Sequence, residues 1–460
     1  MTVPIEKNKE YVVDIIDYGF EGEGIAKIDG FTIFIPNAIK GEKVKILIVK
    51  VLSSHGFGKI IEILKKSEHR IDVDCKTYKR CGGCNLRHID YEETLNIKQN
   101  TVQNLVNKTL KNKIDVKKTW GMGNPFFYRN KLQCPIGIDE NNEPIVGVYA
   151  NRSHEIIEMK NCMIQNQESL RIVDTIINEL KKYNISVYNE KTHKGLVRNL
   201  VIKKGVHTGE ILVIFVINGE DISKLKKISE ELINRFQNIK SVVANVNKAK
   251  TNVVLGNNNI NIYGNGYIED ILGEYVFKIS TNSFYQINPV QAEALYNIAL
   301  ENTNITKNDV VFDLYCGVGT ISIFASKFAK KVYGVEIVEQ AIDDAIDNAK
   351  RNNIDNVEFL VGDTEFVLEE LIEKKKILPD VIIVDPPRKG LDKTTIGNIL
   401  KIKPKKISYI SCNPATLIRD LAFFEDDYNI EFIQPVDMFP WTSHVECVAV
   451  MKLIYMKLEN

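Results

Sequence analysis

The sequence predicts an α/β protein in three parts: a small N-terminal β-barrel, a central α/β domain and a C-terminal doubly wound domain. Five short β-like runs separated by glycine-containing turns fill the first 65 residues, which is typical of a small barrel. From about residue 290 strands and helices alternate regularly, which indicates a parallel sheet with helices on both faces. We expect the three parts at residues 1–65, 66–280 and 281–460.

Bulk composition is that of an ordinary soluble globular protein, with 44% hydrophobic and 26% charged residues among 460. The first residues lack the basic-then-apolar order of a signal peptide. No apolar run approaches the roughly 18 residues that span a membrane. We therefore expect a cytoplasmic protein with no membrane partner.

The N-terminal part and the segment that follows it have features of a nucleic-acid-binding region. Over the whole chain 60 Lys and Arg balance 60 Asp and Glu, but residues 59–132 hold 16 against 8. Such a local excess fits a surface that contacts phosphates, although an ordinary solvated surface has the same composition. The barrel strands are expected at residues 11–16, 24–28, 32–35, 44–51 and 59–64.

Four of the eight cysteines are grouped in a way that is typical of metal ligands: Cys75, Cys81 and Cys84, with Cys162 further on. In a reducing compartment this grouping indicates a metal rather than disulfides. Zinc sites usually pair their ligands in two Cys-x2-Cys turns, so three clustered cysteines with one remote partner favour an iron–sulfur cluster. Zinc remains the alternative, and Cys134 is expected in the core.

The central domain is outlined by fewer elements. A helix should run from residue 91 to about residue 110, followed by strands at 200–204 and 210–217 and an amphipathic helix near 222–236. These elements indicate a mixed α/β domain.

Three consecutive strands of the C-terminal part, at residues 310–314, 332–335 and 357–361, end in groups suited to an adenosine cofactor. A glycine turn follows the first strand, and carboxylates close the second and third, where they can contact ribose and adenine. The predicted contacts are Gly317, Gly319, Glu336 and Asp363. Because the turn is Asp-x3-Gly-x-Gly-Thr, no pyrophosphate loop is evident, and S-adenosylmethionine is favoured over a nicotinamide dinucleotide.

Two later strands, at residues 380–384 and 407–410, are also expected to end at the edge where parallel sheets bind ligands. The second runs into Ser-Cys-Asn-Pro, which places Cys412 at a turn. A thiolate that adds to carbon 6 of uracil makes carbon 5 nucleophilic toward a methyl sulfonium, and a base must then remove the carbon 5 proton. Cys412 is the expected nucleophile and Glu446, before the last strand, the expected base. The competing thiols, which lack such a turn, are Cys316 and Cys447.

These motifs resemble those of the bacterial RNA (uracil-C5)-methyltransferase family. The similar stretches are Asn282-Ser283-Phe284-Tyr285-Gln286, Asp313-Leu314-Tyr315-Cys316-Gly317-Val318-Gly319-Thr320, Asp385-Pro386-Pro387-Arg388, Ser411-Cys412-Asn413-Pro414 and His444-Val445-Glu446. The resemblance implies a Rossmann-like methyltransferase domain, with Cys412 as nucleophile and Glu446 as base. It also implies that the cofactor or the target base is contacted by Gln286, Tyr315, Glu336 and Asp385.

The N-terminal barrel, with Gly19–Ala26 and Gly41–Val44, resembles a TRAM domain, an RNA-binding module. The barrel and the four cysteines are similar to those of the RlmD-type branch, which implies a 4Fe-4S cluster and 23S ribosomal RNA as substrate. We expect RNA rather than DNA as the partner, and a monomer.

Two other classes stay open at this point. A TRAM domain with a cysteine group also resembles radical-S-adenosylmethionine methylthiotransferases, but those use a Cys-x3-Cys-x2-Cys triad and carry the barrel at the other end of the chain. A non-catalytic iron–sulfur RNA-binding protein is the second alternative, and it leaves Cys412 and Glu446 without a role.

Overall fold

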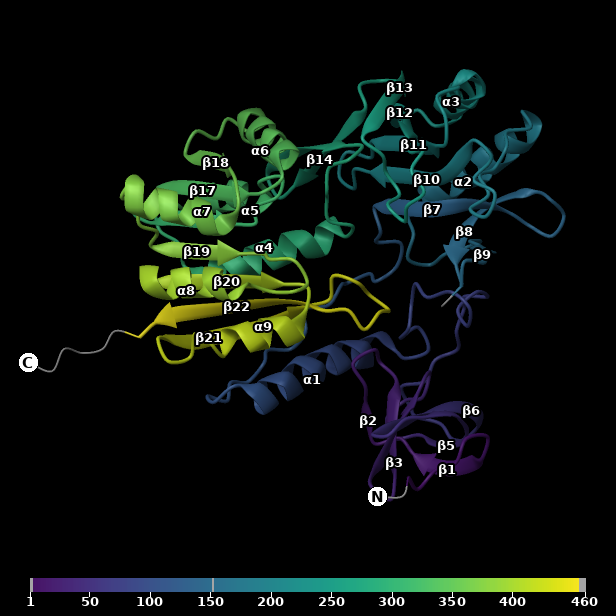
Figure 1. Cartoon of the computed structure of the whole chain (residues 1–460), viewed down its shortest axis with the longest axis horizontal. Helices are drawn as coiled ribbons and strands as arrows, with labels where there is room; N and C mark the ends of the chain where they lie inside the picture. Colours follow the sequence, from purple (N-terminus) through teal and green to yellow (C-terminus); the bar gives the residue numbers. More distant parts are fainter. Residues whose placement is uncertain (1–2, 151–152, 455–460) are drawn as a thin grey trace, which may run out of the picture.

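The computed structural model describes residues 3–150 and 153–454. Figure 1 shows the barrel beneath the rest of the molecule, the C-terminal sheet on the left and the central sheet on the upper right. Among the described residues no helix is both long and apolar enough to cross a membrane. The larger sheets form an N-terminal, a central and a C-terminal group.

The N-terminal sheet has six strands in the order β1-β5-β6-β4-β3-β2, one more than the five expected. The additional strand, β2, has only two residues. Residues alternate between the inside and the outside of the sheet, so that Ile33, Ile35, Ile46 and Ile48 form an aliphatic core. The strands are β1 (Glu10–Asp14), β2 (Asp17–Tyr18), β3 (Gly24–Ile28), β4 (Phe31–Ile35), β5 (Lys43–Val51) and β6 (His55–Lys65).

The central domain is built on a seven-stranded mixed sheet in the order β13-β12-β11-β10-β7-β8-β9, with α2 and α3 packed together beside it. Cys134 is buried in this core, as expected. Its elements are β7 (Lys131–Ile138), β8 (Pro144–Tyr149), β9 (Ile156–Glu158), α2 (Gln167–Lys182), β10 (Val197–Lys204), β11 (Ile211–Ile217), α3 (Ser223–Arg235), β12 (Ile239–Val246) and β13 (Asn258–Tyr263). A separate hairpin, β14 (Tyr267–Leu272) and β15 (Tyr275–Ser280), leads to the C-terminal part.

The C-terminal sheet has seven strands in the order β18-β17-β16-β19-β20-β22-β21. The first five are parallel, whereas β22 is antiparallel to both β20 and β21. The elements are α4 (Pro289–Thr303), β16 (Val310–Leu314), α5 (Thr320–Ser326), β17 (Lys331–Glu336), α6 (Glu339–Arg351), β18 (Val357–Val361), α7 (Thr364–Glu369) with a π-helical turn (Glu370–Lys374), β19 (Val381–Val384), α8 (Lys393–Ile402), β20 (Lys406–Ser411), α9 (Pro414–Leu421), β21 (Tyr428–Val436) and β22 (Glu446–Leu453).

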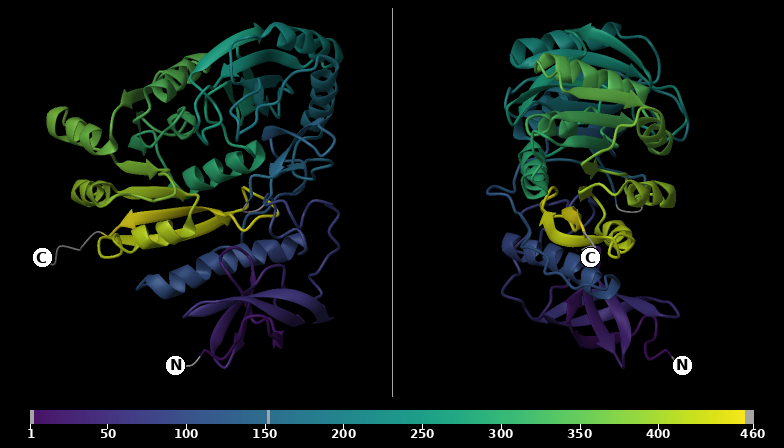
Figure 2. Two further views of the ribbon diagram at one scale, coloured as in Figure 1. Left: turned by 45° about the vertical axis from the view of Figure 1, so that its right-hand side comes forward. Right: turned by 90° about the vertical axis from the view of Figure 1, so that its left-hand side faces the viewer.

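One helix crosses between the parts. The helix α1 (Tyr91–Thr109) falls within the range expected for the central domain, yet its apolar face packs on the C-terminal core through Val102 and Val106. Figures 1 and 2 show it lying between the barrel and the β20–β22 side of the C-terminal sheet. The helix therefore joins the barrel to the domain that carries the predicted catalytic residues.

Candidate active site

The predicted nucleophile and base meet because β22 runs against its neighbour. Ser411, the last residue of β20, pairs with Cys447, the second residue of β22. Cys412 follows the first strand and Glu446 begins the second, so both lie at the same edge of the sheet. This is also the edge at which the parallel strands β16 and β19 end, where open α/β sheets bind ligands.

The buried phenol of Tyr296, on α4, lies near three of the predicted site residues. Its pKa is raised by burial, and the next largest cause is the charge of Asp385. The side-chain amide of Gln286 lies beside this phenol and lowers its pKa, and the carboxylate of Glu446 is a further neighbour. The structure therefore brings Gln286, Asp385 and Glu446 together, and Tyr296 is a residue of the site that the sequence motifs did not indicate.

The predicted nucleophile and base lie in an environment that favours their neutral forms. Burial raises the pKa of Glu446 to about 8, and Asp385 adds to this shift. Burial also raises the pKa of Cys412, followed by the charges of Glu446 and Asp385. The pKa of Asp385 itself is raised to about 7 by burial. A carboxyl group whose pKa lies near the working pH is well suited to general base catalysis.

One cation opposes these shifts. The guanidinium of Arg388 lowers the pKa of both Cys412 and Glu446. Its backbone oxygen accepts hydrogen bonds from Asn413 Nδ2 at 3.0 Å and Thr416 Oγ1 at 3.3 Å, which tie the loop after β19 to the turn that carries Cys412. The sequence motif contained Arg388, but no role was predicted for it.

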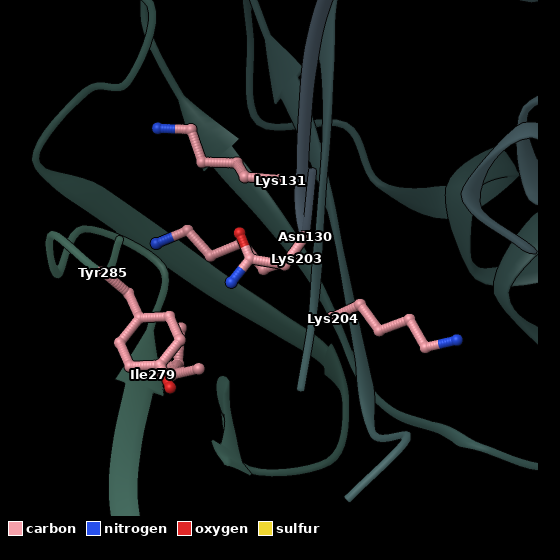
Figure 3. A pocket seen from close by; sticks show the side chains of 6 residues that line it. All are labelled: Asn130, Lys131, Lys203, Lys204, Ile279 and Tyr285. Atoms are coloured by element: carbon pink, nitrogen blue, oxygen red, sulfur yellow. The ribbon is translucent and has the colours of Figure 1, made fainter. Parts of the chain in front are cut away.

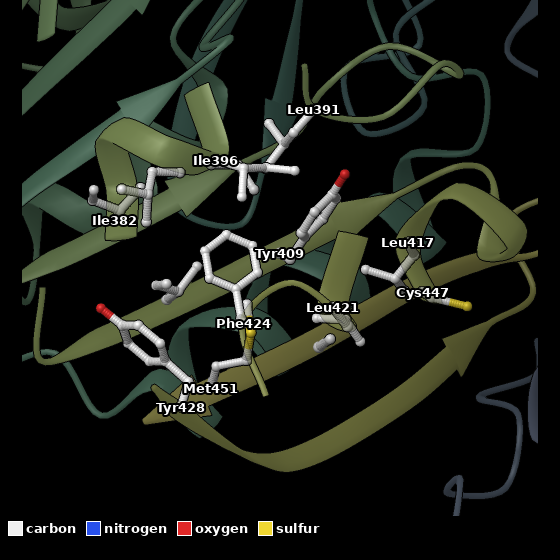
Figure 4. Close-up of a cluster of buried hydrophobic side chains, with 14 of the residues drawn as sticks. Ile382, Leu391, Ile396, Tyr409, Leu417, Leu421, Phe424, Tyr428, Cys447 and Met451 are labelled. Atoms are coloured by element: carbon white, nitrogen blue, oxygen red, sulfur yellow. The ribbon is translucent and has the colours of Figure 1, made fainter. Parts of the chain in front are cut away.

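The two competing thiols are poorly placed for attack. Cys447 is fully buried in the C-terminal core (Figure 4), and Cys316 is also buried, whereas Cys412 is partly exposed. Burial raises the pKa of both Cys447 and Cys316 well above the ordinary value of a thiol. Of these three thiols only Cys412 is partly exposed to solvent.

The two glycines of the turn after β16 differ in their surroundings. A side chain at Gly317 would meet no atom within 4 Å, so its α-carbon opens onto free space, and its N–H donates to Glu336 Oε2 at 3.2 Å. A side chain at Gly319 would collide with Phe359 and Ala345, at 2.7 and 2.9 Å. Gly317 and Glu336 thus form an open cradle at the end of β16, whereas Gly319 allows α5 to pack closely.

The remaining predicted contacts surround this cradle. Tyr315 has a φ of 67°, a left-handed conformation that is costly for a tyrosine, and its side chain lies near Thr395, Asp392 and Asp363. Asp363 follows β18 and caps α7 by accepting the N–H of Glu365 at 3.0 Å. Five of the seven predicted cofactor residues therefore lie at the ends of β16, β17 and β18, whereas Gln286 and Asp385 lie elsewhere.

The loop that carries Gln286 is held by the central domain. Lys203 Nζ donates to the carbonyls of Ser280 and Ser283 at 2.7 and 2.9 Å, and Asn130 Nδ2 donates to the carbonyl of Gln286 at 2.9 Å. Figure 3 shows the amines of Lys203 and Lys131 on the same side of the pocket, with Tyr285 beneath them. Burial and the charge of Lys131 lower the pKa of Lys203 to about 7.

The loop between β21 and β22 is held by contacts with α1 and with residues 85–87. The buried ammonium of Lys98, on α1, pairs with Asp437, whose other oxygen accepts the Tyr91 hydroxyl at 2.6 Å. Trp441, with a φ of 68°, accepts the N–H groups of Asn85 and Leu86 at 3.1 Å, and the guanidinium of Arg87 lies 4.1 Å from its ring. These contacts connect the segment after the cysteine group with the loop that ends at Glu446.

The four predicted metal ligands gather in one region. Cys75, Cys81, Cys84 and Cys162 are free and partly buried, and the other three contribute to raising the pKa of Cys84 to about 12, after burial as the main cause. Cys84 and Cys162 also pack against the same cluster around Trp441. Over residues 3–150 and 153–454, however, no group of three or more His, Cys, Asp or Glu is arranged to hold a metal ion.

Part of the basic segment is committed to internal contacts. Arg70 pairs with the buried carboxylate of Glu42, and Arg87 pairs with Asp74 at 2.7 Å while remaining buried. Lys98 is fully buried. These three cations hold the fold together, so the positive surface available to RNA is smaller than the local sequence excess indicated.

Comparison with known proteins identifies the family. The family described as tRNA (uracil-5-)-methyltransferase matches residues 90–453, and the TRAM domain matches residues 4–61. Uncharacterised RNA methyltransferases of Clostridium acetobutylicum and Halalkalibacterium halodurans are 45% and 43% identical to this chain, each covering 98% of it and 99% and 98% of their own lengths.

Among solved structures, the Pyrococcus abyssi tRNA (uracil-54, C5)-methyltransferase in complex with S-adenosyl-L-homocysteine covers 96% of this chain and 100% of its own. The TM-score is 0.76 and the identity 25%. The combined matches show that this chain is an S-adenosylmethionine-dependent RNA methyltransferase of the tRNA (uracil-5-)-methyltransferase family, with an N-terminal TRAM domain.

Proposed function

We propose that the protein methylates carbon 5 of a uridine in ribosomal RNA, 23S rRNA in particular, through a covalent intermediate on Cys412. The observation that carries the proposal is the meeting of a partly exposed thiol and a buried carboxyl group at the end of β20 and the start of β22. Neither the radical alternative nor a non-catalytic binding protein accounts for this pair.

The chain's own residues perform the steps on the base. The Cys412 thiolate adds to carbon 6 of uracil, and the electron density that this moves to carbon 5 makes that carbon nucleophilic. S-adenosylmethionine supplies an electrophilic methyl group. The Glu446 carboxylate then takes the proton from carbon 5, and departure of the Cys412 thiolate restores the aromatic ring. Asp385 acts on both residues and Gln286 lies beside Tyr296, and both are proposed to orient the base.

The residues proposed to hold S-adenosylmethionine are those at the strand ends. The open α-carbon of Gly317 beside the Glu336 carboxylate supports a ribose contact, and the exposed Asp363 after β18 supports an adenine contact. The side chain of Tyr315 is proposed to contact the cofactor between its ribose and its adenine. Gly319 supports the site indirectly, because its lack of a side chain lets α5 approach β18.

A 4Fe-4S cluster on Cys75, Cys81, Cys84 and Cys162 is part of the proposal. Four free thiols that act on one another electrostatically supply the soft ligands that iron–sulfur clusters and zinc both use. With a thiolate on each iron, the cluster would serve to shape the region around Trp441, and no redox step is required for the methylation.

Ribosomal RNA is proposed because the barrel and the four cysteines together are similar to the branch that acts on it. One observation favours transfer RNA as a second candidate: the Pyrococcus abyssi structure, which covers nearly all of this chain, is named as a tRNA enzyme. Mapping 5-methyluridine in both RNAs from a strain that lacks the gene, and from the same strain with the gene restored, separates the two.

The chemical proposal is tested with an RNA that carries 5-fluorouridine at the target position. Fluorine at carbon 5 cannot leave as a proton, so the wild-type enzyme should form a denaturation-resistant adduct. Cys412→Ala should form no adduct and no product while still binding S-adenosylhomocysteine, and Cys447→Ala is the matched control. Turnover by Cys412→Ala within tenfold of wild type would exclude Cys412 as the nucleophile.

A further inference from the structure

Three aromatic rings gather on the outer face of the N-terminal barrel. Phe34, on β4, lies beside His55 and Phe57, on β6, with ring centroids 5.4 and 5.9 Å away, and the two β6 rings are 5.3 Å apart. The ammonium of Lys50, on β5, lies 5.9 Å from the centroid of Phe57. All three rings are partly exposed to solvent.

The rings are not needed for the barrel core. That core is aliphatic, and the residues that alternate with the rings on β6 are Gly56 and Gly58. A side chain at these glycines would lie 2.6 Å from Ile5 or 2.9 Å from Ile46, so β6 lies close over the core and its aromatic residues are directed outward. Burial in the core therefore does not explain three rings at these positions.

The aromatic face continues toward the active site. The ring of Phe34 lies 3.3 Å from the point where a side chain at Gly19 would begin, and the next residue, Phe20, is 58% exposed. The same turn carries Gly22, which packs against Leu86 and Ser443. The surface thus leads from β6 across the β2–β3 turn to the loop that ends at Glu446.

The charged residues along this path favour an arrangement in which the bases of an RNA lie on the rings and its phosphates contact the lysines beside them. Lys27, Lys50 and Lys59 are exposed on the strands around the aromatic face. At the β2–β3 turn the carboxylates of Glu21 and Glu23 oppose phosphate contact. A single strand has unstacked bases that can lie on aromatic rings, whereas the bases of a duplex are already stacked.

We propose that Phe34, His55 and Phe57, with Phe20 at the turn, form a stacking surface for single-stranded RNA that flanks the target uridine. The proposal rests on the proposed function only for the identity of the ligand as the methylated RNA. Lys50 and its neighbours would contact the phosphates between the stacked bases, so the TRAM domain would hold the strand while the target uridine enters the site.

The surface is tested by fluorescence anisotropy on the full chain, with a labelled 12-nucleotide single-stranded RNA that contains one uridine, and without S-adenosylmethionine. Phe57→Ala should weaken binding about tenfold, because stacking on one ring contributes that order of affinity. Phe57→Trp should bind as wild type. Phe57→Leu, which keeps apolar volume in the barrel, should bind as weakly as Phe57→Ala.

Val12→Ala is the matched control, because Val12 is 52% exposed on β1 and lies outside the aromatic face. It should leave the dissociation constant unchanged, and the wild type should bind the same RNA less well after annealing to its complement. Binding by Phe57→Leu within twofold of wild type would overturn the proposal, as would equal affinity for the strand and the duplex. This assay measures binding without methylation, so its result does not depend on whether the fluorouridine adduct forms.

Discussion

Asn85 and Ser443 are 358 positions apart in sequence and are joined by two hydrogen bonds. Ser443 N donates to Asn85 Oδ1 at 2.9 Å, and Asn85 Nδ2 donates to Ser443 Oγ at 3.0 Å. The same amide nitrogen donates to the carbonyl of Glu21 in the barrel at 2.5 Å. Asn85 follows Cys84, and Ser443 precedes Glu446 by three residues. One side chain therefore links the barrel, the cysteine group and the loop of the proposed base.

The first prediction is that Asn85 positions Glu446. Asn85→Ala removes both links to Ser443, so product release should slow about tenfold while fluorouridine adduct formation by Cys412 stays near the wild-type rate. Asn85→Asp keeps the acceptor for Ser443 N and should recover part of the loss. Asn96→Ala, on the exposed side of α1, is the control. Equal slowing of adduct formation and release would assign Asn85 a general structural role instead.

The second prediction concerns Glu446→Gln. The amide keeps the shape of the side chain but cannot accept the carbon 5 proton. Methylated RNA should therefore remain bound to Cys412, and gel electrophoresis under denaturing conditions should show an adduct that contains the transferred methyl group. Normal turnover without such an adduct would assign proton removal to another group or to water.

The third prediction is a pH dependence. Cys412 and Glu446 both act in their ionised forms, and their environment raises both pKa values, that of Glu446 to about 8. The single-turnover rate should therefore rise with pH between 6 and 8.5. Arg388→Ala removes the cation that lowers both pKa values, so its profile should shift to higher pH, with the greatest loss of rate near pH 7. Arg388→Lys keeps the charge and should shift less. A loss of rate by the same factor at every pH, with no shift of the profile of Arg388→Ala, would contradict this role.

The fourth prediction concerns the cysteine group. Protein purified without oxygen should contain about four iron and four sulfide per chain. Cys162→Ser should lose iron and lower the unfolding temperature, with RNA affinity falling more than S-adenosylhomocysteine affinity. Cys134→Ser is the control, because Cys134 is buried in the central core. Stoichiometric zinc without iron in the wild type would exclude the cluster but leave the methyltransferase mechanism unchanged.

The sequence by itself determined the parallel strands of the C-terminal sheet and the edge at which the chemistry is expected. The parallel strands β16 to β20 lie within a few residues of their expected ranges, because short apolar runs between glycine turns and capped helices are local signals. The same local rule explains why Cys412 was expected at a turn: Asn413 caps α9 by accepting the N–H of Ala415 at 3.1 Å.

Only the tertiary structure decided which of these residues meet. The antiparallel insertion of β22 between β20 and β21 brings Glu446 beside Cys412, and strand direction has no local signal in the residues of a buried strand. The position of Tyr296 near the predicted site residues, the packing of α1 on the C-terminal core and the Asn85–Ser443 link all depend on residues far apart in the chain. Such contacts arise from packing of whole elements, which a linear pattern does not record.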